Sequence, residues 1–535
     1  MEYLFLKMKS FLITISYIIL LITLVKAKDK IYHTYESLGI DALQKHQVET
    51  KMEEESSLPV INISTKNNSE LILSRDNYTD CVVDIFNVEK KYKLKEKSAG
   101  IRVRGNSSSY KGDIEKIKAN IVPYKIKFTD KINLLGLHHG EEFKDWVLIK
   151  TAENVIRQDA SFKMGHVIFD DKQYISDSII VKVYVNDKLQ GVYTLLEQNK
   201  VHEKKVNISV PEKNYNGTDI GYYFEIDNYH DYYPENEGKF FILDYEEATV
   251  KDILGVERQF IPTGVTIKSD FYCHDQVDFI GNYTENVFKI LYLATEKGIY
   301  KTLDENYRLI NSTYTNAQET ISAVFDMDTV VNMYLLYEIV HDYDVGEGSF
   351  YFAVDLSKDS KNKKLQMVSP WDFDWTFNDS PTRYWAGTFC EENFAKRKGD
   401  RSNPWFIEFA KQDWFHSLVS EKWQKASSSS KVKKIIAEGE QFVADHLDDC
   451  LIVSEIVVEA VGNFTNWVSQ RMDWMDETFA VNSTISDPIV EQTTIDIEIP
   501  SGEVEVDDNI NSSDDEEEVE STEDVDVKED SAEEN

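Results

Sequence analysis

Apolar residues recur at helical spacing across residues 327–339. This period predicts a helix, and an acidic residue, Asp326 or Asp328, is placed to cap its first turn. Asp342 and Asp344 follow in a loop that is rich in glycine. The pattern therefore predicts a helix that leads two carboxylates into a loop.

After this loop the side chains alternate as they do in strands. Phe350, Phe352 and Val354 predict one strand, and residues 365–369 predict its partner across a turn. The second strand runs into Trp-Asp-Phe-Asp at residues 371–374. Two acidic clusters are therefore expected at the ends of two adjacent strands.

The N-terminal half predicts a further pair of strands. Residues 101–104 predict a strand that leads into a Gly/Ser-rich loop, and residues 124–128 predict a second strand. Alternation along the second strand places Lys125 and Lys127 on one face and apolar side chains on the other. The lysines then face solvent or a ligand.

Two more patterns follow in the same half. Residues 145–150 predict a strand that runs into a helix at about residues 156–165. Residues 179–198 predict a β-hairpin, because β-branched and aromatic residues flank a turn at Asn186-Asp187. Glu197 ends the apolar second strand of this hairpin, where an acidic residue is a candidate for function.

The C-terminal part of the chain is predicted to be helical. Aromatic residues recur at helical spacing in residues 405–423 and 464–475, which favours core packing over ligand binding. Neither an internal repeat nor a long linker interrupts residues 28–480, so we expect one large α+β domain. Its first part, residues 28–69, is polar and is expected to be a loose lead-in or an extra strand.

The N-terminus has the features of a secretory signal peptide. Lys7 and Lys9 precede an apolar run at residues 11–25, and Val-Lys-Ala at residues 25–27 suits cleavage. The run is short for a membrane span, and we expect no span beyond it. We therefore exclude residues 1–27 from the fold, with an uncleaved anchor as the alternative.

Other features agree with secretion to the cell surface or the medium. The four cysteines, Cys81, Cys273, Cys390 and Cys450, are even in number and widely spaced, so we expect one or two disulfides in an oxidising compartment. Acceptor sequons for N-glycosylation are dense and include Asn62, Asn77, Asn106, Asn207, Asn216, Asn282, Asn311, Asn463 and Asn482.

The formal net charge of −38 argues against nucleic acid as a partner. Residues 487–535 hold 21 acidic residues and one lysine, which gives −20 and leaves −18 for the rest of the chain. This tail lacks aromatic residues and is expected to be disordered. Ser512, Ser513, Ser521 and Thr522 make it a candidate autophosphorylation substrate or a mimic of acidic substrates, and a solubilising tail is the alternative.

The acidic clusters suggest a metal site. Crowded carboxylates repel one another unless they share a cation, and oxygen ligands without His or Cys suit Mg²⁺, Mn²⁺ or Ca²⁺. The alternative is that Asp342 and Asp344 are turn residues and that Asp372 caps a loop. A calcium helix-loop-helix fits less well, because Glu347 stands where that loop needs Gly and Ala353 where it needs Glu.

These motifs resemble the spore coat protein H (CotH) kinase family, atypical secreted or surface protein kinases known from spore-forming bacteria and fungi. The resemblance rests on the Asp-x-Asp at residues 326–328, on Asp344, on Ser349 before an aromatic strand, and on Pro-Trp-Asp-Phe-Asp at residues 370–374. The spacing of Asp344, Ser349 and the later Asp-Phe parallels the catalytic loop and DFG segment of ordinary protein kinases. The spore-coat branch carries Asn where this chain has Ser349.

The resemblance covers roughly residues 99–479. It implies an atypical protein-kinase-like fold with mixed or antiparallel sheets and a helical C-terminal part. We place this domain at residues 96–482, after a lead-in at residues 28–95 and before the tail.

The resemblance also implies the site. ATP and Mg²⁺ (or Mn²⁺) are the implied cofactors, with Asp344 and Asp372 as catalytic residues. The implied metal ligands are Asp344, Ser349, Asp372 and Asp374. The implied cofactor-binding residues, with Glu197 paired to Lys127 as in kinases, are Arg104, Lys127, Arg157 and Glu197.

The expected function is a secreted kinase that phosphorylates Ser or Thr of extracellular or secretory-pathway proteins. No Walker loop and no G-x-G-x-x-G occurs in the chain, so nucleotide binding must be unconventional. One alternative is a non-catalytic surface or adhesion protein on the same fold that binds an extracellular protein. Another is an accessory protein of secreted polysaccharide-degrading machinery.

Overall fold

The computed structural model describes residues 30–170, 172–346, 348–377, 380–388, 402–425 and 428–480, except the side chain of Glu235. The predicted signal peptide, Cys390, Asn482 and the acidic tail lie outside these residues. The described residues belong to one of the two units into which the chain divides, Met1–Asp487. They form both helices and sheets, which confirms the α+β class.

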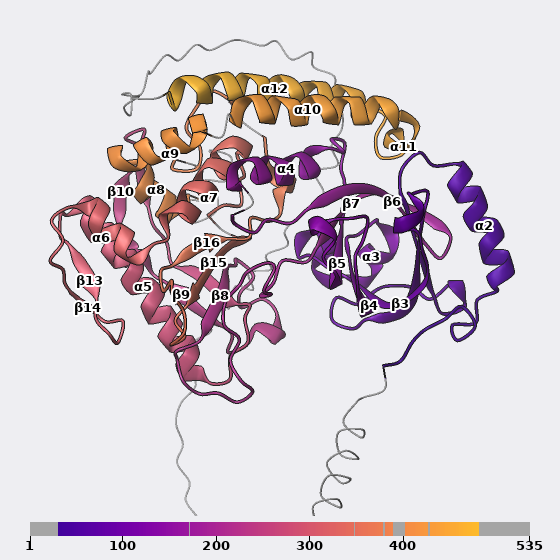
Figure 1. Ribbon diagram of the computed structural model, residues 1–535, viewed down its shortest axis with the longest axis horizontal. Helices are drawn as coiled ribbons and strands as arrows, with labels where there is room; N and C mark the ends of the chain where they lie inside the picture. The colour runs from indigo at the N-terminus through magenta and orange to yellow at the C-terminus, as the bar shows by residue number, and fades with distance from the viewer. Residues whose placement is uncertain are drawn as a thin grey trace, which may run out of the picture. The chain divides into compact units, whose positions relative to one another are not determined.

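Seven strands close into a barrel in the order β1-β2-β3-β4-β5-β7-β6, seen on the right of Figure 1. All neighbours are antiparallel except β1 and β6, whose parallel pairing closes the barrel. Two strands come from the segment described above as a lead-in. The strands are β1 (Val60–Thr65), β2 (Thr79–Phe86), β3 (Leu94–Val103), β4 (Tyr124–Ile132), β5 (Phe143–Lys150), β6 (Ser178–Val185) and β7 (Lys188–Glu197).

Strand β5 shows how the barrel joins the rest of the molecule. Trp146 and Leu148 belong to the core inside the barrel, whereas Val147 and Ile149 belong to a larger core shared with the helices. Successive side chains of a strand face opposite sides, so both faces of β5 are covered. The apolar run in its sequence follows from this double burial.

A second, five-stranded antiparallel sheet has the order β16-β15-β8-β12-β9. Its strands are β8 (Gly221–Ile226), β9 (Phe240–Leu243), β12 (Thr263–Ile267), β15 (Phe350–Asp355) and β16 (Gln366–Val368). Two separate hairpins pair β10 (Thr249–Lys251) with β11 (Glu257–Gln259) and β13 (Lys301–Leu303) with β14 (Leu309–Asn311).

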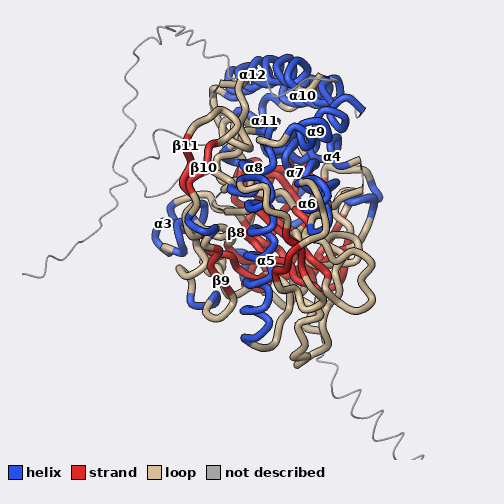
Figure 2. Tube along the Cα trace, turned by 90° about the vertical axis from the view of Figure 1, so that its left-hand side faces the viewer, coloured by secondary structure: helices blue, strands red, loops and turns tan. Residues whose placement is uncertain are grey.

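Helices lie around this sheet, with α10 and α12 above the strands in Figure 2. Helix α7 packs against β16 and α4, α5 packs against β9, and α10 lies between α4 and α12 in contact with both. None of the helices in the described ranges has the length and apolarity needed to cross a membrane. The helices are α2 (Ala42–Glu54), α3 (Ile114–Ala119), α4 (Arg157–Phe169), α5 (His274–Glu296), α6 (Ala317–Val324), α7 (Met327–Val340), α8 (Pro404–Ala410), α9 (Asp413–Lys425), α10 (Ser428–Asp445), α11 (Leu447–Leu451) and α12 (Val457–Thr478).

Several local predictions are confirmed. The β6–β7 hairpin turns at Asn186 and Asp187, whose φ values of 50° and 61° suit a tight hairpin turn. Helix α7 and the β15–β16 pair also form as predicted. The predicted cap is wrong for Asp326, because its carboxylate accepts a hydrogen bond from Asn362 (2.7 Å) and none from the helix start.

The expected disulfides are not formed among the described cysteines. Cys81, Cys273 and Cys450 are free thiols, so an arrangement with two disulfides is wrong. The reason is their placement, because Cys81 lies in the barrel core on β2 and Cys450 is buried on α11.

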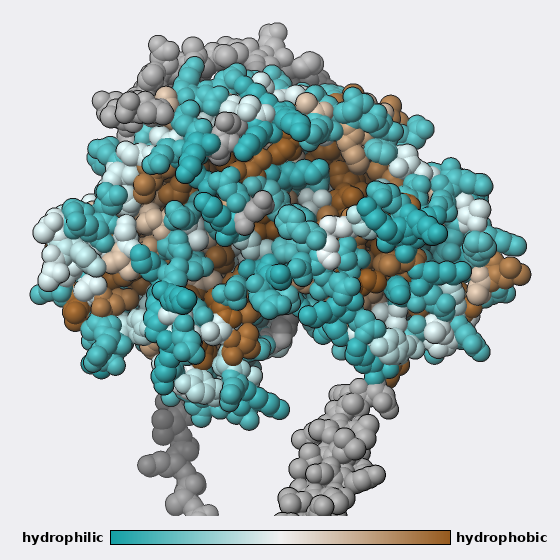
Figure 3. All heavy atoms as spheres, viewed as in Figure 1, coloured by the Kyte–Doolittle hydropathy of each residue, from teal (hydrophilic) through white to brown (hydrophobic). Residues whose placement is uncertain are grey.

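Hydrophilic residues cover most of the face seen in Figure 3, with hydrophobic residues visible between them.

A buried ion pair ties the helical layer together. The Arg471 guanidinium on α12 lies 2.6 Å from the Glu338 carboxylate on α7, and both side chains are fully buried. Arg471 also donates to the main-chain carbonyls of Pro381 and Arg383, at 2.9 and 2.6 Å. The Glu338 carboxylate accepts the main-chain N–H groups of Trp385 and Ala386, at 2.9 and 2.8 Å.

Removing one partner of this pair should destabilise the protein strongly. Glu338→Ala would leave the Arg471 charge buried without its counterion, which typically costs about 3–5 kcal/mol. We expect the free energy of unfolding, measured in urea, to fall by that order.

The matched control is Lys433→Ala, which removes an exposed pair with Asp473 (2.7 Å) and should change stability by about 1 kcal/mol or less. Equal effects of the two substitutions would contradict a structural role of the buried pair.

Candidate functional site

A pocket of about 420 Å³ lies between the barrel and the second sheet. Its barrel side includes Arg102 and Arg104 at the end of β3 and Lys125 on β4. Its other side includes residues from the loops that flank β15 and β16, namely Asp344, Ser349, Asp372 and Asp374. The four acidic or hydroxyl residues predicted as metal ligands therefore line one pocket.

The loop after α7 carries the first acidic cluster. The helix ends where His341 adopts a left-handed conformation (φ 50°), and Asp342 beyond it is buried. The Asp342 carboxylate accepts the main-chain N–H of Asp344 at 3.0 Å, and the Asp344 carbonyl accepts the N–H of Gly348 at 2.9 Å. Asp342 therefore shapes the loop, and Asp344 lines the pocket.

The second acidic cluster follows β16. Asp372 is left-handed (φ 65°, ψ 64°) and is followed by a short 3-10 turn, Phe373–Trp375. Two residues at the start of α4 hold this turn. The Gln158 side chain accepts the N–H of Phe373 at 3.2 Å, and Arg157 donates to the Asp374 carbonyl at 3.1 Å.

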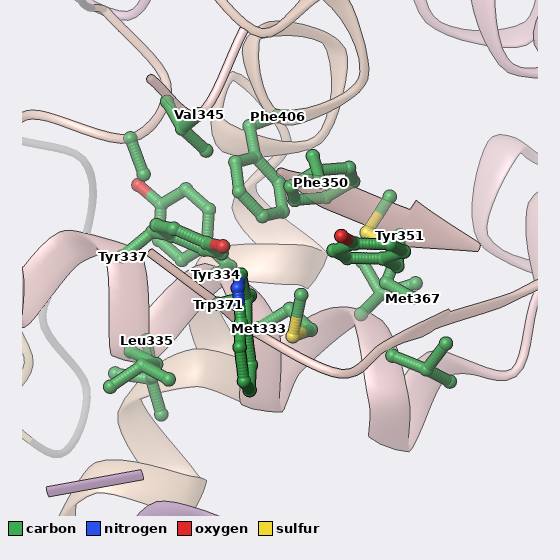
Figure 4. Packing of buried hydrophobic residues seen from close by; sticks show 14 of the residues in the cluster. Met333, Tyr334, Leu335, Tyr337, Val345, Phe350, Tyr351, Met367, Trp371 and Phe406 are labelled. Atoms are coloured by element: carbon green, nitrogen blue, oxygen red, sulfur yellow. The ribbon is translucent and has the colours of Figure 1, made fainter. Parts of the chain in front are cut away.

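Aromatic side chains pack against the segments that carry both acidic clusters. The rings of Tyr337, Phe350 and Phe406 pack against one another (Figure 4): the Phe350 ring lies 5.7 Å from that of Tyr337 and 5.3 Å from that of Phe406. Phe162 of α4 meets the Phe373 ring at 5.0 Å. This packing fixes the main chain on which the carboxylates stand.

The acids of the pocket are electrostatically crowded. Burial and the nearby charges of Asp344, Asp374 and Asp372 raise the pKa of Asp342 well above its ordinary value. Burial and the charges of Asp372 and Asp344 do the same to the pKa of Asp374. Burial also raises the pKa of Asp372, opposed by Arg104 and by a hydrogen bond from Ser349. A bound cation would stabilise the ionised form of these crowded carboxylates.

The barrel side of the pocket is crowded with cations. Burial lowers the pKa of Lys125 to about 8, opposed by the charge of Asp145 and assisted by the charges of Arg102, Lys200 and Arg104. The Lys125 ammonium lies 3.8 Å from the Asp145 carboxylate. An anion in the pocket would relieve this repulsion.

Lys127 does not line the pocket, although the sequence made it the candidate phosphate-binding lysine. It lies on the same outer face of β4 as Lys125, and it is exposed. Lys125 lines the pocket, and Lys127, two residues further along β4, does not. The structure therefore brings Lys125, not Lys127, to Arg104.

The predicted pairing of Glu197 with Lys127 is also absent from the structure. Glu197 is fully buried at the end of β7, its carboxylate lies 3.2 Å from His138 Nδ1, and it accepts the N–H of Asp177 at 3.2 Å. These partners follow from the barrel, because the end of β7 lies beside residues that precede β5 and β6. Arg157 contacts the Asp374 main chain as described above, and it does not line the pocket.

Several pocket residues were not found from the sequence. They are Arg75, Arg102, Glu225, Asp227, Lys268 and Tyr351. The sequence pattern could have indicated two of them. Glu225 interrupts the buried apolar run of β8, and Lys268 directly follows the buried run of β12. Charged side chains at such positions are rarely tolerated without a partner.

The donor set of the acidic side fits a hard divalent cation, since it offers carboxylate and hydroxyl oxygens. In the described residues, a trio of carboxylates with ligand atoms within 4.8 Å of one another occurs elsewhere, at Asp244, Glu246 and Glu285. That trio is largely exposed, and Lys289 lies 2.7 Å from Glu246 within it. The pocket acids suit a cation by their charge and their oxygen ligands, whereas the ligand atoms of the surface trio already lie close together.

Comparison with known proteins gives one informative match. A family model described as "CotH kinase protein" matches residues 101–475, which is more than half of the chain. No curated protein matches closely enough to count as a relative.

Among solved structures, the chain is similar to one described as the Shewanella oneidensis MR-1 toxin–antitoxin system HipA, HipB and its operator DNA complex, at 8% identity and a TM-score of 0.23. The match covers 62% of this chain and 57% of that one, and so low a score carries no argument about fold or function.

The crowded acids predict a stability that depends on pH and on metal. The pKa values of Asp342, Asp372 and Asp374 are raised above their ordinary 3.8, so their contribution is fully present below about pH 4 and is lost as the pH rises through the raised values. A divalent cation competes with these protons. We expect Mg²⁺ to raise the melting temperature more at about pH 8 than at about pH 5.5.

Scanning fluorimetry of protein in EDTA or in excess MgCl₂ would measure this. Burial and Asp244 raise the pKa of Glu285 to about 8, so the surface trio is tested separately with Asp244→Asn. The effect should persist in Asp244→Asn and shrink in Asp372→Asn, and the reverse result would place the metal at the surface.

Proposed function

Because the chain belongs to the CotH kinase family, whose kinase-like character implies use of a nucleotide and a metal in general, we propose that it is a secreted ATP- and Mg²⁺-dependent protein kinase. Its substrates would be Ser or Thr hydroxyls of extracellular or secretory-pathway proteins. The observation that carries the proposal is one pocket with acids crowded on one side and cations on the other.

The two charged sides match the two parts of a metal–nucleotide complex. Polyphosphate carries several negative charges and suits Arg102, Arg104 and Lys125, while a divalent cation suits Asp372 and Asp374. Neither ligand alone would relieve the crowding on both sides. A pocket of about 420 Å³ is also within the size range of small-molecule sites.

The residues would divide the work as follows. Asp372 and Asp374 would hold the metal, which when bound neutralises phosphate charge, with Ser349 beside them. Arg104 would bind phosphate oxygens, its guanidinium lying 5.6 Å from the Trp371 ring and its charge acting on Asp372. Asp344 would accept the hydrogen bond of the acceptor hydroxyl and orient it toward the phosphate. Such catalysis consists mainly of positioning and charge neutralisation.

A non-catalytic surface protein on the same fold is the second candidate. The observation that favours it is Ser349, which stands where the spore-coat branch of the family carries Asn. A surface protein of this kind would keep the fold without metal-dependent nucleotide binding.

Titration with ATP separates the two candidates. Purified protein should bind ATP in the presence of Mg²⁺ or Mn²⁺, and Asp372→Asn should weaken binding about tenfold or more by removing a metal ligand. Asn tolerates the left-handed backbone at this position, so the substitution removes charge without adding strain.

The control for that titration is Asp244→Asn in the surface trio, which should bind ATP as the parent does. Absence of ATP binding with every divalent cation would reject the kinase and favour the surface protein.

Secretion through a eukaryotic pathway makes a prediction about sequon occupancy. Asn62 is fully buried with its amide 3.1 Å from the Asp187 carboxylate, and Asn106 lines the pocket and accepts a hydrogen bond from Arg75. A glycan at either position is incompatible with the folded site. The exposed candidates include Asn77, Asn207, Asn216, Asn282, Asn311 and Asn463.

Glycopeptide mass spectrometry of protein secreted by a eukaryotic host would check this. Among the sequons that the structure describes, glycans should be absent from Asn62 and Asn106 and confined to exposed asparagines. Retention of all protein inside the cell would contradict secretion.

A further inference from the structure

Lys268 is a pocket residue to which the proposed function gives no role. It follows directly on β12, and its ammonium lies 2.6 Å from the Glu225 carboxylate and 3.3 Å from the Asp227 carboxylate. All three residues line the pocket. They form a charged group on the second sheet, away from the barrel cations.

Both carboxylates are held in place by other contacts. Glu225 accepts the hydroxyl of Tyr351 at 2.8 Å, and Asp227 accepts the hydroxyl of Thr266 at 3.0 Å. Although burial opposes its charge, the two carboxylates raise the pKa of Lys268, so the ammonium stays charged. An ammonium has three donors, and the two carboxylates account for two of them, which leaves one for a ligand.

The register of the second sheet places Lys268, Glu225 and Asp227 close to the segment that leads from the Asp344 loop into β15. Tyr351 pairs with Glu225 across β15 and β8, and Phe350 pairs with Ile226. One further step along this antiparallel pair brings Ser349 level with Asp227. A Cβ atom on Gly348 would lie 3.6 Å from the Asn228 side chain, which shows how closely the two segments approach.

The pocket thus offers cations on two opposite sides. Arg102, Arg104 and Lys125 come from the barrel, whereas Lys268 comes from the sheet that carries Ser349 and adjoins the Asp344 loop. In phosphoryl transfer, negative charge spreads over the oxygens of the transferred group, which lies next to the acceptor. A fixed cation on the acceptor side is the one placed to meet that charge.

We propose that Lys268 binds the terminal, transferable phosphate of the nucleotide, and that Glu225 and Asp227 are positioning residues that hold its ammonium. This assignment rests on the proposed function and deepens it. It also gives a reason for a lysine with two carboxylate neighbours at a phosphate site. The two carboxylates fix the ammonium before the nucleotide arrives, so that little ordering is needed on binding.

The test compares two nucleotides that differ only in the terminal phosphate. Calorimetric titration with ATP and with ADP, each in excess Mg²⁺, should show tighter binding of ATP by the parent protein. In Lys268→Met the affinity for ATP should fall about tenfold while that for ADP stays within about twofold, because a charge-assisted hydrogen bond to one phosphate is lost.

The matched control is Lys289→Met. Lys289 lies 2.7 Å from Glu246 and its side chain is 33% exposed, while Lys268 lies 2.6 Å from Glu225 and its side chain is 31% exposed. Unlike Lys268, Lys289 lies outside the pocket. This control should leave both affinities unchanged. Lys268→Arg, which keeps the charge, should keep part of the preference for ATP.

Glu225→Gln tests the positioning role without removing the lysine. It should lower the affinity for ATP more than that for ADP, by a smaller factor than Lys268→Met. It also carries the comparison, together with Lys268→Arg, if Lys268→Met does not fold.

The outcomes separate this assignment from the function on which it rests. Equal loss of ATP and ADP affinity in Lys268→Met would place the lysine at another part of the nucleotide, and no loss of either would make the group purely structural. Both results overturn the assignment while leaving the kinase proposal intact. A parent protein that binds neither nucleotide overturns the proposed function itself.

Discussion

The buried pair of Glu338 and Arg471 is the constraint on which the rest of the site depends. It joins α7 to α12, and through main-chain hydrogen bonds it also fixes residues 381–386. Asp344 lies a few residues beyond the end of α7, and Asp372 lies shortly before residue 381. A buried ion pair gains little net stability over a well-packed apolar pair, because desolvation offsets the attraction. Its effect here is positional, since it sets where both acidic loops begin or end.

Backbone strain gathers in the segments that this pair anchors. Among the residues described between positions 341 and 377, five non-glycine residues have positive φ, namely His341, Ser349, Ser369, Asp372 and Phe377. Each such residue costs free energy that the surrounding packing must offset. The offset comes from aromatic contacts. The His341 ring stacks on that of Trp385 at 4.4 Å, and the Phe377 ring meets that of Phe464 at 4.6 Å. The aromatic composition of the C-terminal helices therefore serves the acidic loops as well as the core.

The sequence predicted the parts of the site that local patterns determine. Helix α7, the β15–β16 pair and the loop acids were readable, because period and turn chemistry are properties of neighbouring residues. The sequence could not decide between Lys125 and Lys127, because both side chains lie on the same face of β4. Only the closed barrel determines which of them reaches the pocket. The partners of Glu197 were hidden for the same reason, because His138 and Asp177 come from distant parts of the chain.

The two-sided charge of the pocket also bears on Ser349, which stands where the spore-coat branch of the family carries Asn. A serine hydroxyl has one donor and two acceptor lone pairs. Its hydrogen bond to Asp372 opposes the rise in the pKa of that carboxyl, so the donor helps to keep Asp372 ionised. The lone pairs of the same oxygen stay available to a cation bound by Asp372 and Asp374. An asparagine offers a stronger carbonyl ligand but must use its amide for the hydrogen bond. The serine therefore retains both roles in a shorter side chain, and the substitution is compatible with a metal held mainly by the two aspartates.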